Sequence, residues 1–350
     1  MKRTRIHIQG AGKVGRGLAR LLRAEGAKVT LRAARDGLPS TPLDADVVVL
    51  AVRDRDLAPL ATELAASGLV PRRAVCVHVA GALGPEVLAA LRPVCAGVAQ
   101  MHPMIAFAAP HASPTLARGQ LHVDGDEAAV RAARKLGNLL GMTPRTLPHM
   151  DKMLYHASAG LVANGAAALA ALGAQLLGVA GVPPEVAPRM LGPLLRSVAE
   201  NVEGLGFPAA LTGPVRRGDA ATVAKQAALL EEKLPSLLRF YLESVAAQLP
   251  LARALGEAAP SAFDAIEAEL QRRSTPHGLP PTACPPTERE VSTDMAKRTG
   301  AMSALSAQGF EQRGLPAGRD GLTWRRWSRL SPHRSLRSRS PSREAEDSSS

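Results

Sequence analysis

The sequence is poor in aromatic residues and in cysteine. Phe, Trp and Tyr make up 3% of its 350 residues, whereas hydrophobic residues as a group make up 46%. A chain of this length can bury a substantial core and is expected to form two domains. Alanine, leucine and glycine dominate, which favours helices and parallel strands over an aromatic-rich β-sandwich.

The three cysteines, Cys76, Cys95 and Cys284, are odd in number and lack the spacing of metal ligands. This argues against a disulfide scaffold or a zinc site and predicts a reducing, cytoplasmic environment. No metal site is therefore expected.

The chain also lacks an obvious targeting or membrane segment. Its basic first five residues are not followed by the apolar core of a secretory signal. The long apolar run after Tyr155 is rich in Ala and Gly and carries Asn164 and Gln175, so we predict a buried helix rather than a membrane span.

Positive charge is concentrated in the C-terminal tail. The residues from Gln271 onward carry 14 basic and 8 acidic side chains, which supply +6 of the net charge of +12. Residues 328–343 form a Ser/Arg/Pro tract that cannot bury enough surface to fold, so we predict disorder there. A nucleic-acid partner would depend on this tail alone, and we regard the tail as a dispensable extension.

The motif around which the chain is organised is Gly10-x-Gly12-x-x-Gly15. Lys13 and Val14 occupy its two variable positions before Gly15. Alternating apolar residues precede the motif and a helical apolar period follows it, so it joins a strand to a helix. In this context the glycines allow a tight turn, a close approach to a pyrophosphate and close packing of helix on strand. The helix N-terminus would attract the phosphates. The motif predicts a dinucleotide-binding site.

The end of the second expected strand, residues 27–31, bears on the choice of cofactor. Arg32 and Arg35 follow it, where NAD-dependent proteins usually place an acidic residue and NADP-dependent proteins an arginine. We predict NADP, with NAD less favoured; the alternative is a solvated charge cluster. The loop after Val52, at the end of the third strand, would also face the cofactor.

Further apolar runs at 74–79 and 97–101 alternate with helical segments, so the fold class is expected to be α/β with a doubly wound parallel Rossmann sheet. Ligands bind beyond the carboxyl ends of such strands. His78 and His102 lie there, either as functional groups or as residues that order a loop.

From His149 to about Leu270 the helical period dominates, which predicts an all-helical second domain. Lys152 and His156 share a helix face, with Asn164 two turns beyond. A lysine in a first helical turn opposes the helix dipole, and such local conflicts gather at functional sites. We predict that Lys152, His156 and Asn164 form the polar centre of an active site, with His102 as the alternative.

A second polar cluster, residues 212–219, contains Thr212, Arg216 and Arg217 between glycines. The two arginines suggest a loop that receives an anionic substrate. The alternative is a helix–helix turn in which Asp219 caps the next helix, and both can hold together.

These segments carry a resemblance to a known family. The glycine motif, residues 44–49, 78–81, 102–104, 155–157 with Asn164, and 212–219 resemble the Rossmann-like bacterial proteins whose second domain is the domain of unknown function 2520. That family is similar to pyrroline-5-carboxylate, ketopantoate and 3-hydroxyacid reductases. The resemblance implies an NADP-dependent oxidoreductase, often a dimer through its helical domain. In ketopantoate reductase and hydroxyisobutyrate dehydrogenase a lysine, followed four residues later by asparagine, serves the substrate. Lys152 matches that lysine, and His156 stands in place of the asparagine.

The sequence thus predicts three regions: a Rossmann domain at 1–148, a helical substrate and dimerisation domain at 149–270, and a disordered basic tail at 271–350. The expected function is hydride transfer between NADP and a small carbonyl, hydroxy-acid or imine substrate. A cofactor-binding sensor or complex subunit without turnover is the alternative.

Overall fold

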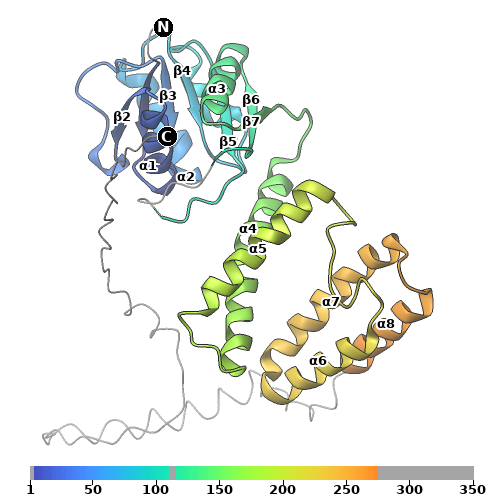
Figure 1. Ribbon diagram of the computed structural model, residues 1–350. Coiled ribbons are helices and arrows are strands. Elements are labelled where there is room, and N and C mark those ends of the chain that lie inside the picture. Colours follow the sequence, from blue (N-terminus) through green and yellow to red (C-terminus); the bar gives the residue numbers. More distant parts are fainter. Residues whose placement is uncertain (1–3, 110–115, 275–350) are drawn as a thin grey trace, which may run out of the picture. The chain divides into compact units, whose positions relative to one another are not determined.

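The computed structural model describes residues 4–109 and 116–274 (Figure 1). The predicted tail lies outside these residues, apart from its first four. The described chain forms a Rossmann-type α/β sheet followed by helices, as the sequence predicted.

The sheet has seven strands in the order β2-β1-β3-β4-β5-β6-β7. They are β1 (Arg5–Gln9), β2 (Lys28–Arg32), β3 (Val47–Leu50), β4 (Val75–His78), β5 (Val98–Pro103), β6 (Gln120–Gly125) and β7 (Thr143–Arg145). The chain leaves β1 for β2 on one side and places β3 on the other, so the switch point of the sheet lies at β1.

The sheet is mostly parallel, as predicted, with one antiparallel pair. The first five strands of the order are parallel, but β6 runs antiparallel to β5, and β7 is parallel to β6. A parallel neighbour needs a crossover, usually through a helix. The described residues between β5 and β6 contain no helix, and β6 pairs with β5 in the antiparallel direction.

Helices cover both faces of the sheet. One apolar core joins the strands to α1 (Lys13–Ala24) and α3 (Glu127–Leu139), and a second joins them to α2 (Asp54–Ser67) and the 3₁₀ segment η2 (Pro85–Leu91). The strands between these layers are buried, which explains their continuous apolar runs.

The helical region contains two sets of helices. Helix α4 (Lys152–Val179) packs with α5 (Ala187–Leu205), whereas α6 (Ala220–Lys233), α7 (Pro235–Leu255) and α8 (Pro260–Ser274) pack on one another around a core of their own. The predicted domain end at Leu270 falls inside α8, which continues to Ser274. Arg273 in this last turn bonds to the buried Glu269 and to Glu231.

The prediction that residues after Tyr155 form a buried helix is wrong for the single chain. None of the residues of α4 is buried. By length and composition α4 is the one helix, among the described residues, that could cross a membrane. Among the described residues, nothing fully covers its apolar side chains.

Candidate functional site

The glycine turn lies at the carboxyl end of β1, and two of its glycines are required by the backbone itself. Gly10 has φ +119°, and a Cβ there would collide with the carbonyl oxygen of Ala51. A Cβ on Gly15 would collide with the carbonyl oxygen of Gly10. These contacts bring α1 close to the strands, as the motif predicts.

Gly12 differs from them, because no atom lies within 4 Å of the position that its Cβ would take. It is the N-cap of α1, where no side chain caps the helix and no acidic residue occupies the first turn, which begins at Lys13 and Val14. Both Gly12 and Lys13 are exposed. The fold does not demand a glycine here, so its missing side chain leaves room for an anion at the helix N-terminus.

The two arginines after β2 have different surroundings. Arg32 donates to the carbonyl oxygens of Gly37, at 2.7 Å, and Asp36, at 2.5 Å, and so fixes the turn η1 (Ala34–Asp36). The Arg35 side chain is 86% exposed and lies 3.7 Å from the Asp36 carboxylate. Arg35 is therefore the more accessible cation, and Arg32 shapes the loop that carries it. Val52, beyond β3, packs partly against the second core.

Polar side chains gather at the ends of β4 and β5 and on β6, together with the start of α4. We call this group the histidine cluster; it comprises His78, His102, His122, Asp124, Lys152, Tyr155 and His156. The antiparallel register of β6 creates much of it, because it sets His122 directly opposite His102 and Asp124 opposite Gln100.

Lys152 is not the solvated charge that a lysine at a helix start usually is. Its side chain is 19% exposed, and Nζ donates to Asp124 Oδ2 at 2.6 Å and lies 3.4 Å from His122 Nε2. Asp151 caps α4 by accepting from the N–H groups of Met153 and Leu154 at 2.9 and 3.0 Å. The cap fixes where α4 begins, and so it fixes the ammonium group of Lys152 beside β6.

His102 contacts the next residues of α4. Its Nδ1 lies 3.0 Å from the Tyr155 hydroxyl, and the two rings meet edge to face at 81°. The His156 ring centroid is 5.9 Å from that of His102. Burial, with a smaller effect of His156, lowers the pKa of His102 to about 4, and burial raises the pKa of Tyr155. At neutral pH both groups are uncharged.

His78 orders a loop, which was one of its two predicted roles. It is fully buried; its Nε2 donates to the Gly84 carbonyl at 3.0 Å and its Nδ1 accepts from the Ala80 N–H at 3.2 Å. Burial, reinforced by Lys152, lowers its pKa to about 4, so the ring stays neutral. Gln100 fixes the same loop by donating to the carbonyls of Ala80 and Gly81.

The structure does not bring every predicted residue to the cluster. Asn164 is exposed on α4, and among the described residues no hydrogen bond joins it to the cluster. Within the same described part of the chain, no group of three or more His, Cys, Asp or Glu residues could hold a metal ion.

The loop at 212–219 has the helix-capping geometry that was one of its two predictions. Asp219 caps α6 by accepting from Thr222 N–H at 3.0 Å. Arg216 makes a bidentate pair with Glu257, at 2.8 and 2.6 Å, and also donates to two loop carbonyls. Arg216 thus stabilises the loop, whereas Thr212 and Arg217 are exposed and remain the candidates for contact with an anion.

Sequence reasoning missed three members of the cluster: His122, Asp124 and Tyr155. The alternation in Leu121-His122-Val123-Asp124 does place His122 and Asp124 on one face of a strand. It does not reveal which strand lies beside them, and that neighbour, β5, supplies His102.

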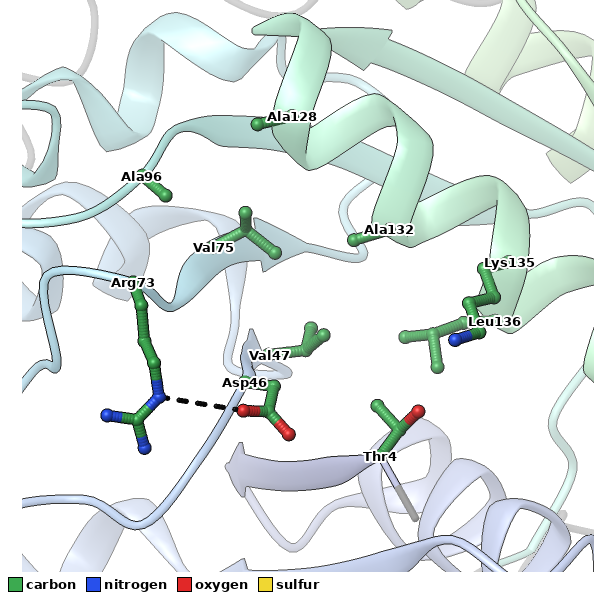
Figure 2. Close-up of a pocket in the computed structure, with 10 residues that line it drawn as sticks. All are labelled: Thr4, Asp46, Val47, Arg73, Val75, Ala96, Ala128, Ala132, Lys135 and Leu136. Carbon is green, nitrogen blue, oxygen red and sulfur yellow. Dashed lines mark ion pairs between the residues drawn. The ribbon is translucent and has the colours of Figure 1, made fainter. Parts of the chain in front are cut away.

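A different edge of the sheet also has a hollow, which Figure 2 shows between the strand starts and α3. Asp46 lies there, paired with Arg73 at 3.7 Å and with Arg5 at 2.7 Å. Its hydrogen bond from Arg5 lowers the pKa of Asp46 to about 2. These charges neutralise one another at the amino ends of the strands, away from the glycine turn, so we do not place the functional site there.

Comparison with known proteins agrees with the predicted family. The family model of the domain of unknown function DUF2520 matches from the start of β6 into α7. The match covers residues 120–247. The matched segment includes His122, Asp124, Lys152 and Tyr155, while the glycine turn precedes it.

Two solved structures share the fold of the chain. A protein of Bacteroides fragilis assigned as an NADP oxidoreductase is 18% identical, with a TM-score of 0.56, over 71% of this chain and 98% of its own. A protein of Thermotoga maritima is 24% identical, with a TM-score of 0.53, over the same shares of the two chains. A search of curated proteins finds no significant match. At these identities the likeness shows the fold alone.

Proposed function

We propose that this protein binds NADP and transfers a hydride between the nicotinamide and a small carbonyl, hydroxy-acid or imine substrate. One observation carries the proposal: the glycine turn and the histidine cluster lie at the same, carboxyl edge of one sheet, where Rossmann-type proteins bind their ligands. From β1 to β5 the edge crosses three strand spacings, about 14 Å. A dinucleotide held at Gly12 would extend along this edge toward His102 and Lys152.

The residues at the turn suit the cofactor. Gly12 and the uncapped start of α1 would receive the pyrophosphate, and Arg35, with Arg32 behind it, would receive a 2′-phosphate. The Bacteroides protein of the same fold is assigned as an NADP oxidoreductase, which supports this choice.

The histidine cluster suits the chemistry. Reduction of a carbonyl or imine places negative charge on the reacting oxygen, or requires a proton at the nitrogen, as the hydride reaches carbon. Lys152 offers a cation that is held by Asp124 and only partly exposed, so its field is less screened than that of a surface lysine. His102 and His122 provide neutral rings beside it.

A pair of substitutions tests cofactor binding without disturbing the fold. Gly12→Asp keeps a favourable N-cap but sets a negative charge where the pyrophosphate would lie, and Gly12→Asn adds a side chain of similar size without the charge. In a fluorescence titration with NADPH we expect Gly12→Asp to bind at least a hundredfold more weakly and Gly12→Asn to bind with intermediate affinity. Unchanged affinity in Gly12→Asp would refute the site.

Lys152→Met tests the chemical role. It should keep NADPH affinity and cut NADPH oxidation, in a screen of small keto acids and cyclic imines, by about a hundredfold, the scale of a lost charge-stabilising or acid–base group. Lys135→Met, at an exposed lysine of α3, is the matched control and should change neither. If turnover stays within a few-fold of the parent, Lys152 only pairs with Asp124, and His102 becomes the better candidate.

The alternative is a protein that binds the cofactor without turnover, as a sensor or subunit. It predicts tight NADPH binding and no oxidation across the substrate screen. Loss of both binding and oxidation would instead remove the whole proposal.

We also propose that the protein is a homodimer that associates through α4 and α5. Thirteen large apolar side chains on these helices are exposed. They are Met153, Leu154, Leu161, Val162, Leu169, Leu176 and Val179 on α4, and Met190, Leu194, Leu195, Val198, Val202 and Leu205 on α5. The two helices offer a face of roughly 700 Å² from their lengths, near the 800 Å² per partner of a stable interface.

A second copy is favoured over a membrane as the partner of this face. Helix α5 carries Arg189, Arg196, Glu200 and Glu203, and Glu203 bonds to Arg118 at 3.0 Å, so a lipid environment would bury these charges at high cost. Light scattering at micromolar concentration should give twice the chain mass of 36.5 kDa. A monomer that sediments with lipid vesicles would overturn the assignment.

A further inference from the structure

The first turn of α4 carries a second polar contact with the sheet, which the roles given above do not use. The Tyr155 hydroxyl lies 3.0 Å from His102 Nδ1, and the Tyr155 ring is 5.6 Å from the His122 ring. Tyr155 is half-buried and lies one turn beyond Lys152 on the same helix. A hydroxyl that bonds to an imidazole can exchange protons with it, and this pair lies where the substrate is expected.

The other nitrogen of His102 lies against the backbone of Gly81. A Cβ on Gly81 would stand 2.8 Å from His102 Nε2 and still closer to His156 Nδ1. Because glycine has no side chain, both rings can approach the backbone here, and we call this place of approach the Gly81 notch. Two ring nitrogens brought this close to one glycine can share a water molecule that reaches them from the solvent side. His156 is exposed, so the notch borders solvent at its ring.

The notch is held in place by buried polar contacts. Gln100 donates to the carbonyls of Ala80 and Gly81 at 2.8 and 3.3 Å, and Ala80 N–H donates to His78. Gly81 is buried and its backbone φ is not in the left-handed region, so the backbone itself would accept another residue. A glycine is needed here because both imidazole rings lie close to it, and not because of the backbone conformation of a turn.

We propose that Tyr155 is the proton donor of this site, and that His102 resupplies it through a water molecule in the Gly81 notch. This inference rests on the proposed function. As the hydride reaches the substrate carbon, the Tyr155 O–H bond breaks and its proton passes to the substrate oxygen or nitrogen. The phenolate then takes the proton from His102 Nδ1, and His102 Nε2 takes one from the water, which regains a proton from solvent past His156. Each turnover thus consumes one solvent proton, and exchange with solvent returns His102 to its starting tautomer. Lys152 holds the negative charge of the substrate during the transfer.

The route requires one tautomer of His102. Nδ1 must carry the hydrogen so that it can donate to the Tyr155 oxygen, and Nε2 must be the acceptor that faces the notch. The ¹⁵N shifts of the His102 ring, measured at neutral pH in the full chain, report this directly, whether or not a substrate is known. A pyrrole-type Nδ1 and a pyridine-type Nε2 are expected; the reverse pattern overturns the relay.

Two variants test the donor and the notch separately. Tyr155→Phe keeps the ring and removes the hydroxyl; we expect unchanged NADPH affinity and a turnover at least a hundredfold lower, the scale of a lost general acid. Gly81→Ala should push the rings of His156 and His102 away from the backbone, because its Cβ would stand 2.8 Å from His102 Nε2 and still closer to His156 Nδ1, and it should lower turnover by at least tenfold. Gly160→Ala, on the same helix with its nearest atom at 3.9 Å, is the matched control and should retain turnover.

The outcomes separate this inference from the proposed function. If the parent oxidises NADPH with a panel substrate and Tyr155→Phe retains turnover within threefold, Tyr155 is not the donor while the function stands. If the parent binds NADPH but oxidises none of it, the proposed function fails and the assignment of Tyr155 as donor fails with it.

Discussion

The two helical parts of this chain have similar Ala/Leu-rich sequences, but one buries its apolar residues and the other leaves them exposed. In α6–α8 the apolar residues face one another, and Val223, Phe263 and Ile266 are almost fully buried. In α4 no residue is buried, and Leu161 is 77% exposed. The comparison teaches that α6–α8 is stabilised by its own core, whereas α4 and α5 leave an apolar surface exposed. Lys152, Tyr155 and His156 of the histidine cluster lie on α4, the helix whose apolar residues are exposed.

The largest expected effect is on the free energy of unfolding, and it compares a substitution in the core of α6–α8 with one at an exposed position. Phe263→Ala should destabilise the protein by about 3–5 kcal/mol, because it opens a cavity in the core of α6–α8 and removes the ring below Arg253. Phe240→Ala removes the same side chain from a position that is 46% exposed, and should change stability by under about 1 kcal/mol. Urea unfolding of both variants checks this, and equal losses would contradict the assignment of the core.

The second effect concerns pH: acid should destabilise the Rossmann sheet before it destabilises α6–α8. The pKa of buried His78 is about 4, below the 6.5 of an unfolded histidine, so as pH falls from 6.5 to 4 the unfolded chain takes up its proton first. Stability that is complete above pH 6.5 is lost over this window, by about 3 kcal/mol from His78 alone. Residues 220–274 contain no histidine, so helicity of α6–α8 should outlast the sheet.

His78→Gln provides the control for the acid experiment. A glutamine offers one donor and one acceptor without titrating near pH 5. Near-UV and far-UV circular dichroism against pH should show a smaller acid loss in this variant. An unchanged loss would show that other groups govern the acid transition.

The third test addresses the exposed face itself. Leu161→Glu should weaken self-association at least a hundredfold, about 2.7 kcal/mol, because a charge would be buried in the apolar interface. Leu229→Glu makes the same change at a 53% exposed leucine of α6 and should leave the dimer intact. Sedimentation equilibrium measures both, and a dimer unaffected by Leu161→Glu would place the interface elsewhere.

The smallest effect concerns the end of α8. Truncation after Ser274 should leave the melting temperature unchanged, whereas truncation after Leu270 should lower it by a few degrees, since Glu269 is buried and loses Arg272 and Arg273. Calorimetry on the two truncated chains distinguishes them. Salt-sensitive binding of DNA or RNA that vanishes on truncation would instead give the tail a function.

The sequence predicted the features that depend on neighbouring residues along the chain. The glycine turn could be read because the backbone at Gly10 and Gly15 admits no other residue. Lys152 could be singled out because it conflicts with the dipole of its own helix. Both signals are visible within a few positions of sequence, although the carbonyl that Gly10 must avoid belongs to the distant Ala51.

The rest depends on contacts between distant segments. The direction of β6 decides that His122 faces His102 and that Asp124 reaches Lys152, and no local pattern encodes that direction. The apolar period of α4 predicts that the helix is covered but not by which surface. The sequence also does not show that α8 extends beyond Leu270, because Arg272 and Arg273 look like a solvated pair until Glu269 and Glu231 are placed beside them.

The length of α4 has a mechanical consequence. Its 28 residues form a single rod, about 42 Å long, with Lys152 at one tip and the apolar surface along its shaft. A tilt of about 4° around the distal tip would displace Lys152 by roughly 3 Å, because the whole rod acts as a lever arm. That displacement is comparable with the 2.6 Å reach between Lys152 Nζ and Asp124. In the proposed dimer, contacts along α4 would therefore determine the position of the Lys152 ammonium group relative to the sheet.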